Sequence, residues 1–251
     1  MNDKPDSDNS KYVEEAKKRI KEQLSLDDFI RKLVSMESET KKAENTLFKA
    51  LFDTYFLYFP EAANLIKDKE AFISALSKGV KRDEISSYLG ISADSMGYNL
   101  SDSDLSAITD SFNQLVGLSG LRTMIELKIS SILEENYINL FKVAGPDIAA
   151  KLISLSGSLK NLSEMPSGKL QVLGAEKSIF GGKKAKTPKY GVIFFHPEIQ
   201  AASDKLKGRI ARVVASKISL AAKVDFFSKE DKSGLILKKM RKEVDKIKNG
   251  T

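Results

Sequence analysis

Apolar positions in the first half of the chain follow the 3.6-residue period of an α-helix. Residues 11–58 contain no Pro or Gly, and Pro60 follows directly after an aromatic run. Because proline lacks an N–H and disfavours helical backbone before it, the pattern predicts one long helix that ends there. Two adjacent apolar series at steps of four, four and three form its wide apolar face: Leu47, Leu51, Tyr55 and Tyr58, and beside them Phe48, Phe52, Phe56 and Phe59.

A second long helix is predicted after a cluster of short helices with breaks at Gly79, Gly90 and Gly97. Ser101 is placed to cap its N-terminus, and acidic residues follow at the positive end of the helix dipole. Two long amphipathic helices around a small cluster predict an antiparallel hairpin of the coiled-coil type, while an ordinary bundle has the same pattern over shorter stretches. The apolar positions recur at steps of three or four: Leu105, Ile108, Phe112, Leu115, Leu118, Leu121, Ile125, Ile129 and Ile132.

The second half begins at Gly145-Pro146-Asp147 and reads as shorter helices rich in small residues. We expect an all-α, mainly helical fold: the hairpin, then a compact helical domain with a short β segment near residues 190–195. The expected domains are a disordered tail (1–10), a coiled-coil helical domain (11–144), a compact domain (145–227) and a basic C-terminal helix or tail (228–251).

Charge divides the chain into two halves. Residues 145–251 hold 22 Lys and Arg against 10 Asp and Glu, a net charge of +12, whereas residues 1–144 carry −5. This asymmetry favours a phosphate-rich partner for the second half, although lysine-rich surfaces also serve solubility alone. There is no cysteine, and no apolar run of transmembrane length. The composition is therefore typical of a soluble intracellular protein.

Catalytic motifs are absent. One histidine cannot build a multi-histidine metal site, and the carboxylates have no metal-ligand spacing. The Gly- and Lys-rich stretch 174–187 lacks the spacing of a phosphate-binding loop, and no dinucleotide-binding glycine pattern is present. We therefore expect no catalytic residues, no metal and no cofactor.

Binding residues are easier to identify. Lysines gather in a loop at 183–189, and a second basic cluster contains Lys205, Lys207, Arg209 and Arg212. On a helix, Lys205, Arg209 and Arg212 share one face, where they would contact a phosphate backbone. His196 has two interpretations: its ring stacks on an unpaired base, or it is a surface or half-buried residue with a satisfied hydrogen bond. The spacing alone favours the second.

Three motifs in the second half of the chain, in this order along the sequence, resemble a known family. The stretches "AAKLISLSGSLKNLSEMPSGKLQVLGAEKSIF", "TPKYGVIFFHPEI" and "KGRIARVVASKISLAAKVD" are similar to the Nop domain. That family includes the archaeal scaffold of box C/D ribonucleoproteins, its nucleolar relatives and a pre-mRNA-processing splicing factor. The resemblance covers 145–227 closely, and the upstream helices look like the coiled-coil region of the family.

The resemblance implies a non-enzymatic scaffold. It would bind a kink-turn (box C/D) RNA jointly with a kink-turn-binding protein, dimerise through the coiled coil, and help guide 2′-O-ribose methylation. The small protein would pack on Gly174, Ala175, Glu176 and Lys177. The implied RNA-binding residues are Lys189, His196, Lys205, Lys207, Arg209, Arg212 and Lys223.

The sequence departs from the family pattern at its start and at Glu164, where relatives commonly carry lysine. Family members begin with a globular domain that holds fibrillarin, whereas about ten polar residues precede the helical region here. Fibrillarin is therefore a partner that only the resemblance to the family implies, and direct binding to it is doubtful. The rival functions are assembly of a splicing ribonucleoprotein, an enzyme acting on RNA, and a coiled-coil oligomerisation module without an RNA role. The expected location is the cytoplasm of an archaeon, or the nucleus and nucleolus of a eukaryote.

Overall fold

The computed structural model describes residues 12–17, 25–175 and 190–249. The described part is helical and contains no strand, which confirms the all-α expectation. It divides into two compact units, each treated separately below. The hairpin unit is Ser35–Leu127, and the α11 unit combines the described residues up to Val34 with those from Lys128 onward. The domain boundaries expected from the sequence remain a prediction.

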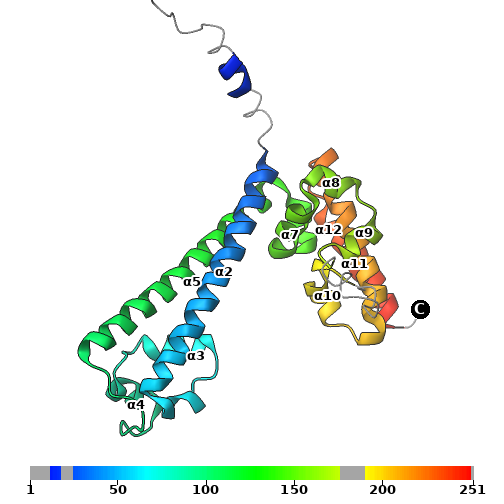
Figure 1. Ribbon diagram of the computed structural model, residues 1–251. Helices are drawn as coiled ribbons and strands as arrows, with labels where there is room; N and C mark the ends of the chain where they lie inside the picture. Colours follow the sequence, from blue (N-terminus) through cyan, green and yellow to red (C-terminus); the bar gives the residue numbers. More distant parts are fainter. Residues whose placement is uncertain (1–11, 18–24, 176–189, 250–251) are drawn as a thin grey trace, which may run out of the picture. The chain divides into compact units, whose positions relative to one another are not determined.

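In the hairpin unit, parts of two long helices run side by side, with short helices at one end (Figure 1). The long helices are α2 (Leu26–Tyr58) and α5 (Asp102–Asn136). Ser101 caps α5, because its hydroxyl accepts the Asp104 N–H at 3.2 Å while Asp104 accepts the Ser101 N–H at 3.0 Å. The short elements between them are the 3-10 helix η1 (Pro60–Asn64) and the helices α3 (Lys69–Leu76) and α4 (Arg82–Leu89).

The core of the hairpin unit is aromatic at the end that holds α3 and α4. Tyr55, Phe59 and Phe72 are completely buried there. Further along, a buried carboxylate joins the helices: Glu44 accepts hydrogen bonds from Lys69 at 2.7 Å and from Arg122 at 3.0 Å. Burial alone would raise the pKa of Glu44, but these two cations lower it on balance. The carboxylate therefore stays charged in the interior.

The α11 unit is built around one helix, α11 (Asp204–Phe227), which packs against most of the others. Its buried face contains small residues such as Ala211, Ala215 and Ala222, which let neighbouring helices approach closely. The surrounding elements are α6 (Ile138–Ala144), α7 (Pro146–Ser156), α8 (Leu159–Glu164), α9 (Ser167–Val172), the 3-10 helix η3 (Val192–Phe195), α10 (Pro197–Gln200) and α12 (Ser233–Lys248).

The expectation of a β segment near 190–195 is wrong. The Gly191 and Val192 N–H groups donate to the carbonyls of Gln171 and Leu173 at 2.8 and 2.9 Å, which resembles a strand ladder for two residues only. From Val192 the backbone turns into η3, which explains why an apolar run looked like a strand in the sequence.

The second long helix ends shortly after Ile132, the last position of its apolar pattern. α5 stops at Asn136, and α6 begins two residues later. The cause is the buried carboxylate of Asp225, which accepts the first N–H groups of α6, from Asn139 at 3.1 Å and Leu140 at 2.7 Å. Those N–H groups lack helical partners, so a carboxylate there stabilises a new helix start.

Candidate functional site

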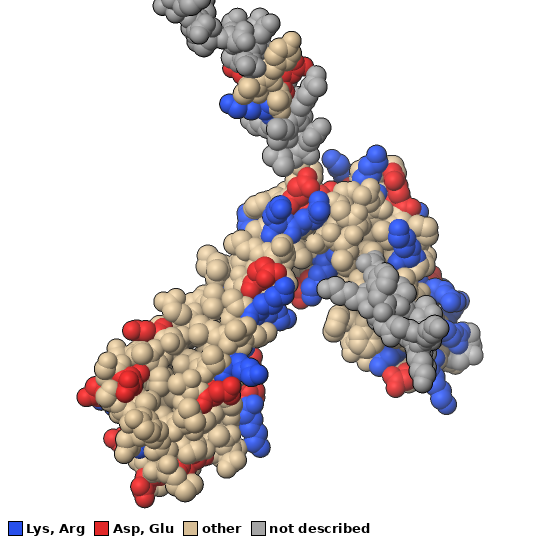
Figure 2. All heavy atoms as spheres, viewed as in Figure 1, with Lys and Arg blue, Asp and Glu red and all other residues tan. Residues whose placement is uncertain are grey.

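The cations expected to contact RNA lie mainly along the solvent face of α11. Lys205, Arg209, Arg212 and Lys223 are exposed and form no ion pair within the described part of the chain. Because 3.6 residues make one turn, these positions follow one stripe that extends about 27 Å at 1.5 Å per residue. In Figure 2, Lys and Arg side chains gather on the unit that contains this helix.

Lys207 differs from its neighbours. Its amine is 2.8 Å from the Asp204 carboxylate and 5.7 Å from the centre of the Phe194 ring, and its side chain is only 20% exposed. Asp204 itself is 93% exposed, so water can replace this carboxylate at little cost. Lys207 is thus partly engaged, while the four cations of the stripe are free to meet an anion. Lys189 lies outside the described residues.

His196 is buried, with 5% of its surface exposed. Its Nδ1 accepts the Glu198 N–H at 3.3 Å and so caps α10, which leaves Nε2 to donate to the Val143 carbonyl at 3.1 Å. Burial lowers the pKa of His196, so the ring is neutral at physiological pH. This corrects the expectation of a ring free to stack on a base: the satisfied hydrogen bonds give His196 a structural role.

The exposed aromatic ring of this segment is the preceding residue, Phe195, which is 70% exposed. It contacts Phe194 edge-on at a centroid distance of 5.8 Å, and Phe194 in turn stacks on Tyr190 at 5.4 Å. The sequence reasoning missed Phe195. Its signal was the aromatic pair before His196, since in a tight turn two adjacent rings cannot both face the core.

The expected protein-binding motif is only partly described. Gly174 and Ala175 follow Leu173, the C-cap of α9, while Glu176 and Lys177 lie outside the described residues. Gly174 has a φ of +86°, and an added Cβ would lie 2.7 Å from Val192 Cγ2. Gly191 is equally constrained, because its Cβ would lie 1.8 Å from the Leu173 carbonyl oxygen. The fold itself therefore requires both glycines.

Other kinds of site find no support within the described ranges. There, no group of three or more His, Asp or Glu side chains is placed to hold a metal ion. Among the same residues, no helix is both long and apolar enough to cross a membrane. What the α11 unit offers is an exposed row of cations on α11 and an exposed aromatic ring at Phe195.

Comparison with known proteins places these features in a family. The family model described as "Nop: snoRNA binding domain, fibrillarin" matches residues 36–249. A NOP5 family protein of Methanocaldococcus jannaschii is 32% identical over 227 residues, which are 84% of this chain and 55% of the relative. Nucleolar protein 58 of Emericella nidulans is 33% identical over 222 residues, covering 82% of this chain and 38% of the relative.

A further relative and a solved structure agree with these matches. Nucleolar protein 56 of Dictyostelium discoideum is 32% identical over 246 residues, 89% of this chain and 45% of the relative. The chain thus spans about half the length of the curated relatives it matches, or less. A crystal structure of a fibrillarin/Nop5p complex shares the fold, with a TM-score of 0.57 at 24% identity over 95% of this chain and 74% of that one. The chain belongs to the Nop family.

Proposed function

We propose that this chain is a non-enzymatic scaffold of a box C/D ribonucleoprotein. It binds a kink-turn RNA jointly with a kink-turn-binding protein and thereby helps to guide 2′-O-ribose methylation. The observation that carries the proposal is the stripe of unpaired cations on α11, together with the exposed ring of Phe195 in the same unit. The family model and the names of the relatives support the same class of function.

The α11 stripe suits a phosphate backbone because it is both charged and rigid. The opposite face of the helix is buried, with Ile210, Val214 and Ile218 completely inaccessible to solvent. The cations are therefore held at fixed intervals, and binding costs little ordering of the backbone. Contacts of this kind set position rather than sequence, and their strength falls steeply with salt.

Phe195 supplies what cations cannot, an apolar surface for an unpaired base. A kink-turn has an internal loop whose bases leave the helical stack, and splayed bases are held by aromatic side chains. Lys207 lies over the neighbouring Phe194 ring, so one cation of α11 is close to this aromatic segment. We assign base stacking to Phe195 in place of His196.

The kink-turn-binding protein would dock at Gly174 and Ala175, with Glu176 and Lys177 as polar contacts. This placement rests on the resemblance of that motif to the family pattern. The small side chains fit close approach of another polypeptide backbone. If the docking is right, Ala175→Trp blocks assembly by steric clash and leaves the fold intact.

Self-association through the hairpin is a further part of the proposal. Leu57, Met96 and Tyr98 are 70%, 92% and 72% exposed. They lie together, because the Tyr98 N–H donates to the Leu57 carbonyl at 2.8 Å and the 95–96 segment is held by Glu61. Exposed apolar clusters of this kind support a protein contact, and a second copy of the chain is the partner proposed here.

The decisive experiment is a gel shift with a kink-turn RNA, with and without the kink-turn-binding protein. We expect a stable complex only when both are present. The double variant Arg209→Gln/Arg212→Gln should weaken this complex and lower its salt dependence by about one unit of slope per lost phosphate contact. Lys41→Gln/Lys49→Gln in the hairpin unit removes the same charge from exposed positions and is the control.

The outcomes separate the candidate functions. No shift with either RNA combination at low salt would leave only the oligomerisation module. Equal effects of both double variants would show that net charge, not the α11 stripe, drives binding. Preference for the kink-turn of a splicing RNA over a box C/D RNA would favour the splicing role. Some relatives are nucleolar proteins, so the proposed location in a eukaryotic cell is the nucleolus. In an archaeal cell the proposed location is the cytoplasm.

A further inference from the structure

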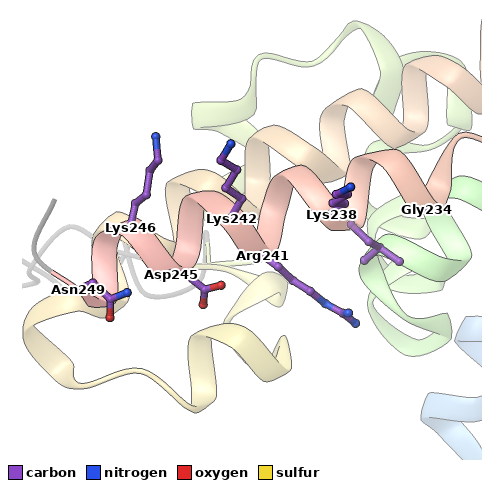
Figure 3. Close-up of a pocket in the computed structure, with 8 residues that line it drawn as sticks. Gly234, Lys238, Arg241, Lys242, Asp245, Lys246 and Asn249 are labelled. Carbon is purple, nitrogen blue, oxygen red and sulfur yellow. The ribbon is translucent and has the colours of Figure 1, made fainter.

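A second basic surface lies on α12, apart from the α11 stripe. One side of α12 is buried through Ile236, Met240 and Val244. Its outer side borders a surface hollow of about 630 Å³ that runs along the helix. Figure 3 shows the side chains of Lys242 and Lys246 projecting from the same side of this helix. The residues that line the hollow include Lys238, Arg241, Lys242 and Lys246.

Four of the α12 cations have no acidic partner. Lys238, Lys239, Arg241 and Lys242 are exposed and form no ion pair within the described part of the chain. The carboxylate of the nearby Glu243 already forms an ion pair with Lys217 of α11 at 2.6 Å, which weakens its attraction for these four cations. We call these four residues the α12 strip.

The α12 strip places like charges next to one another. Lys238 and Lys242 are four residues apart, and Lys238 and Arg241 are three apart, as are Lys239 and Lys242. Such neighbours on a helix face repel each other and destabilise the helix. A polyanion lying along the strip would turn this repulsion into attraction, whereas the lining of the hollow itself contains one carboxylate, Asp245, against four cations.

The C-terminal end of α12 adjoins the segment that carries Phe195. Lys248 pairs with Glu198 of α10 at 3.2 Å, and α10 follows η3 directly. Counting 1.5 Å per residue from Lys248, the strip from Lys242 back to Lys238 lies about 9–15 Å further along the helix. A nucleic acid bound at Phe195 would therefore have the α12 strip within reach.

We propose that the α12 strip is a separate phosphate-binding surface that holds an RNA helix by its backbone, outside the joint kink-turn site. The inference rests on the proposed function, because RNA is the polyanion which that function supplies. The four residues of the strip are all cationic and include no aromatic anchor, which fits phosphate contacts better than a protein interface. The strip extends the grip on the RNA without reading its sequence.

The test uses a straight RNA duplex with no internal loop, and the full chain alone. Binding is measured by fluorescence anisotropy across a salt series. We expect Lys238→Gln/Arg241→Gln/Lys242→Gln to weaken binding about 10-fold or more at low salt and to lower the salt slope by about two to three. The control Lys41→Gln/Lys49→Gln/Lys78→Gln removes three exposed, unpaired cations from the hairpin unit and should change little.

An unchanged salt slope in the α12 variant, or an equal change in the control, would overturn the inference. So would displacement of the duplex by polyglutamate as readily as by RNA at equal charge, because the strip would then be a general anion surface. The kink-turn gel shift separates this failure from that of the proposed function: the α12 variant should assemble the joint complex as well as the unaltered chain, whereas Arg209→Gln/Arg212→Gln should weaken that complex.

Discussion

Substitution of His196 by Phe separates the two roles that one aromatic segment can play. The variant keeps a flat ring, so a base-stacking role for this position would survive it. It removes both hydrogen bonds of the imidazole, to the Val143 carbonyl at 3.1 Å and from the Glu198 N–H at 3.3 Å. If His196 is structural, stability falls while RNA binding by the folded protein is unchanged.

The magnitude follows from what each lost bond leaves behind. Val143 is in the last turn of α6, where carbonyls lack helical N–H partners, and Pro146 has no N–H to offer. An unsatisfied buried carbonyl costs about 1–3 kcal/mol. Loss of the cap on α10 adds about 0.5–2 kcal/mol. We therefore expect the free energy of unfolding to fall by about 2–4 kcal/mol.

Phe195→Ala is the matched variant one residue earlier. Because Phe195 is 70% exposed, its loss should leave the free energy of unfolding nearly unchanged. If it stacks on a base, its removal costs about 1–3 kcal/mol of binding, a Kd about 5- to 150-fold weaker. Stability is measured by urea unfolding monitored by circular dichroism, and binding by gel shift with the kink-turn RNA and its binding protein.

The two variants should thus affect different measurements. The reasoning is refuted if His196→Phe leaves the unfolding midpoint unchanged, because the buried carbonyl would then have found another partner. It is equally refuted if Phe195→Ala binds as tightly as the unaltered chain while His196→Ala binds weakly without losing stability.

Three further predictions concern stability. Glu44→Gln removes the charge that pairs with Lys69 and Arg122, and it should lower the free energy of unfolding, measured in urea, by about 1.5–3 kcal/mol. An unchanged free energy of unfolding would show that the two cations pair elsewhere. Gly191→Ala should cost about 1–3 kcal/mol through its clash with a backbone carbonyl, whereas Gly208→Ala, with no heavy atom within 4 Å of the added Cβ, should be neutral or stabilising; equal effects would contradict the close approach. Since burial lowers the pKa of His196, the unfolded chain binds a proton below pH about 6.5 that the folded chain does not, so stability should fall from pH 6.5 to 5, and His196→Phe should flatten that slope.

The sequence predicted those parts of the fold that depend on local pattern. The long helix before Pro60 and the Ser101 cap are fixed by residues within one or two turns, so periodicity and capping rules suffice. The end of α5 is not local. It depends on Asp225, which accepts the Leu140 N–H from a position 85 residues further along the chain. No window of sequence around Asn136 contains that information.

The candidate site was predictable by composition but not by orientation. The α11 cations follow from helical spacing, and the structure places four of them in solvent. The choice between Phe195 and His196 depends on a shift of one residue within a 3-10 turn, where a single step moves a side chain from the core to the surface. The turn exists because Gly191 approaches the Leu173 carbonyl, a contact between segments that the sequence does not reveal as neighbours.

The buried polar network around Asp225 connects the fold to the proposed binding surfaces. Asn139 donates to Asp225 at 2.7 Å and to the Glu230 carbonyl at 2.8 Å, and it accepts the Lys232 N–H at 2.7 Å. Burial raises the pKa of Asp225, and hydrogen bonds from Asn139 and Leu140 act against that rise. Because one network joins α6, the end of α11 and the start of α12, the α11 stripe and the α12 strip are held in a fixed relation. A polar network costs more to build than an apolar core, but its directional bonds fix geometry as apolar contacts do not. If both proposed surfaces contact one RNA, that fixed geometry raises the affinity, since ordering the surfaces during binding would cost part of the free energy that their charges provide.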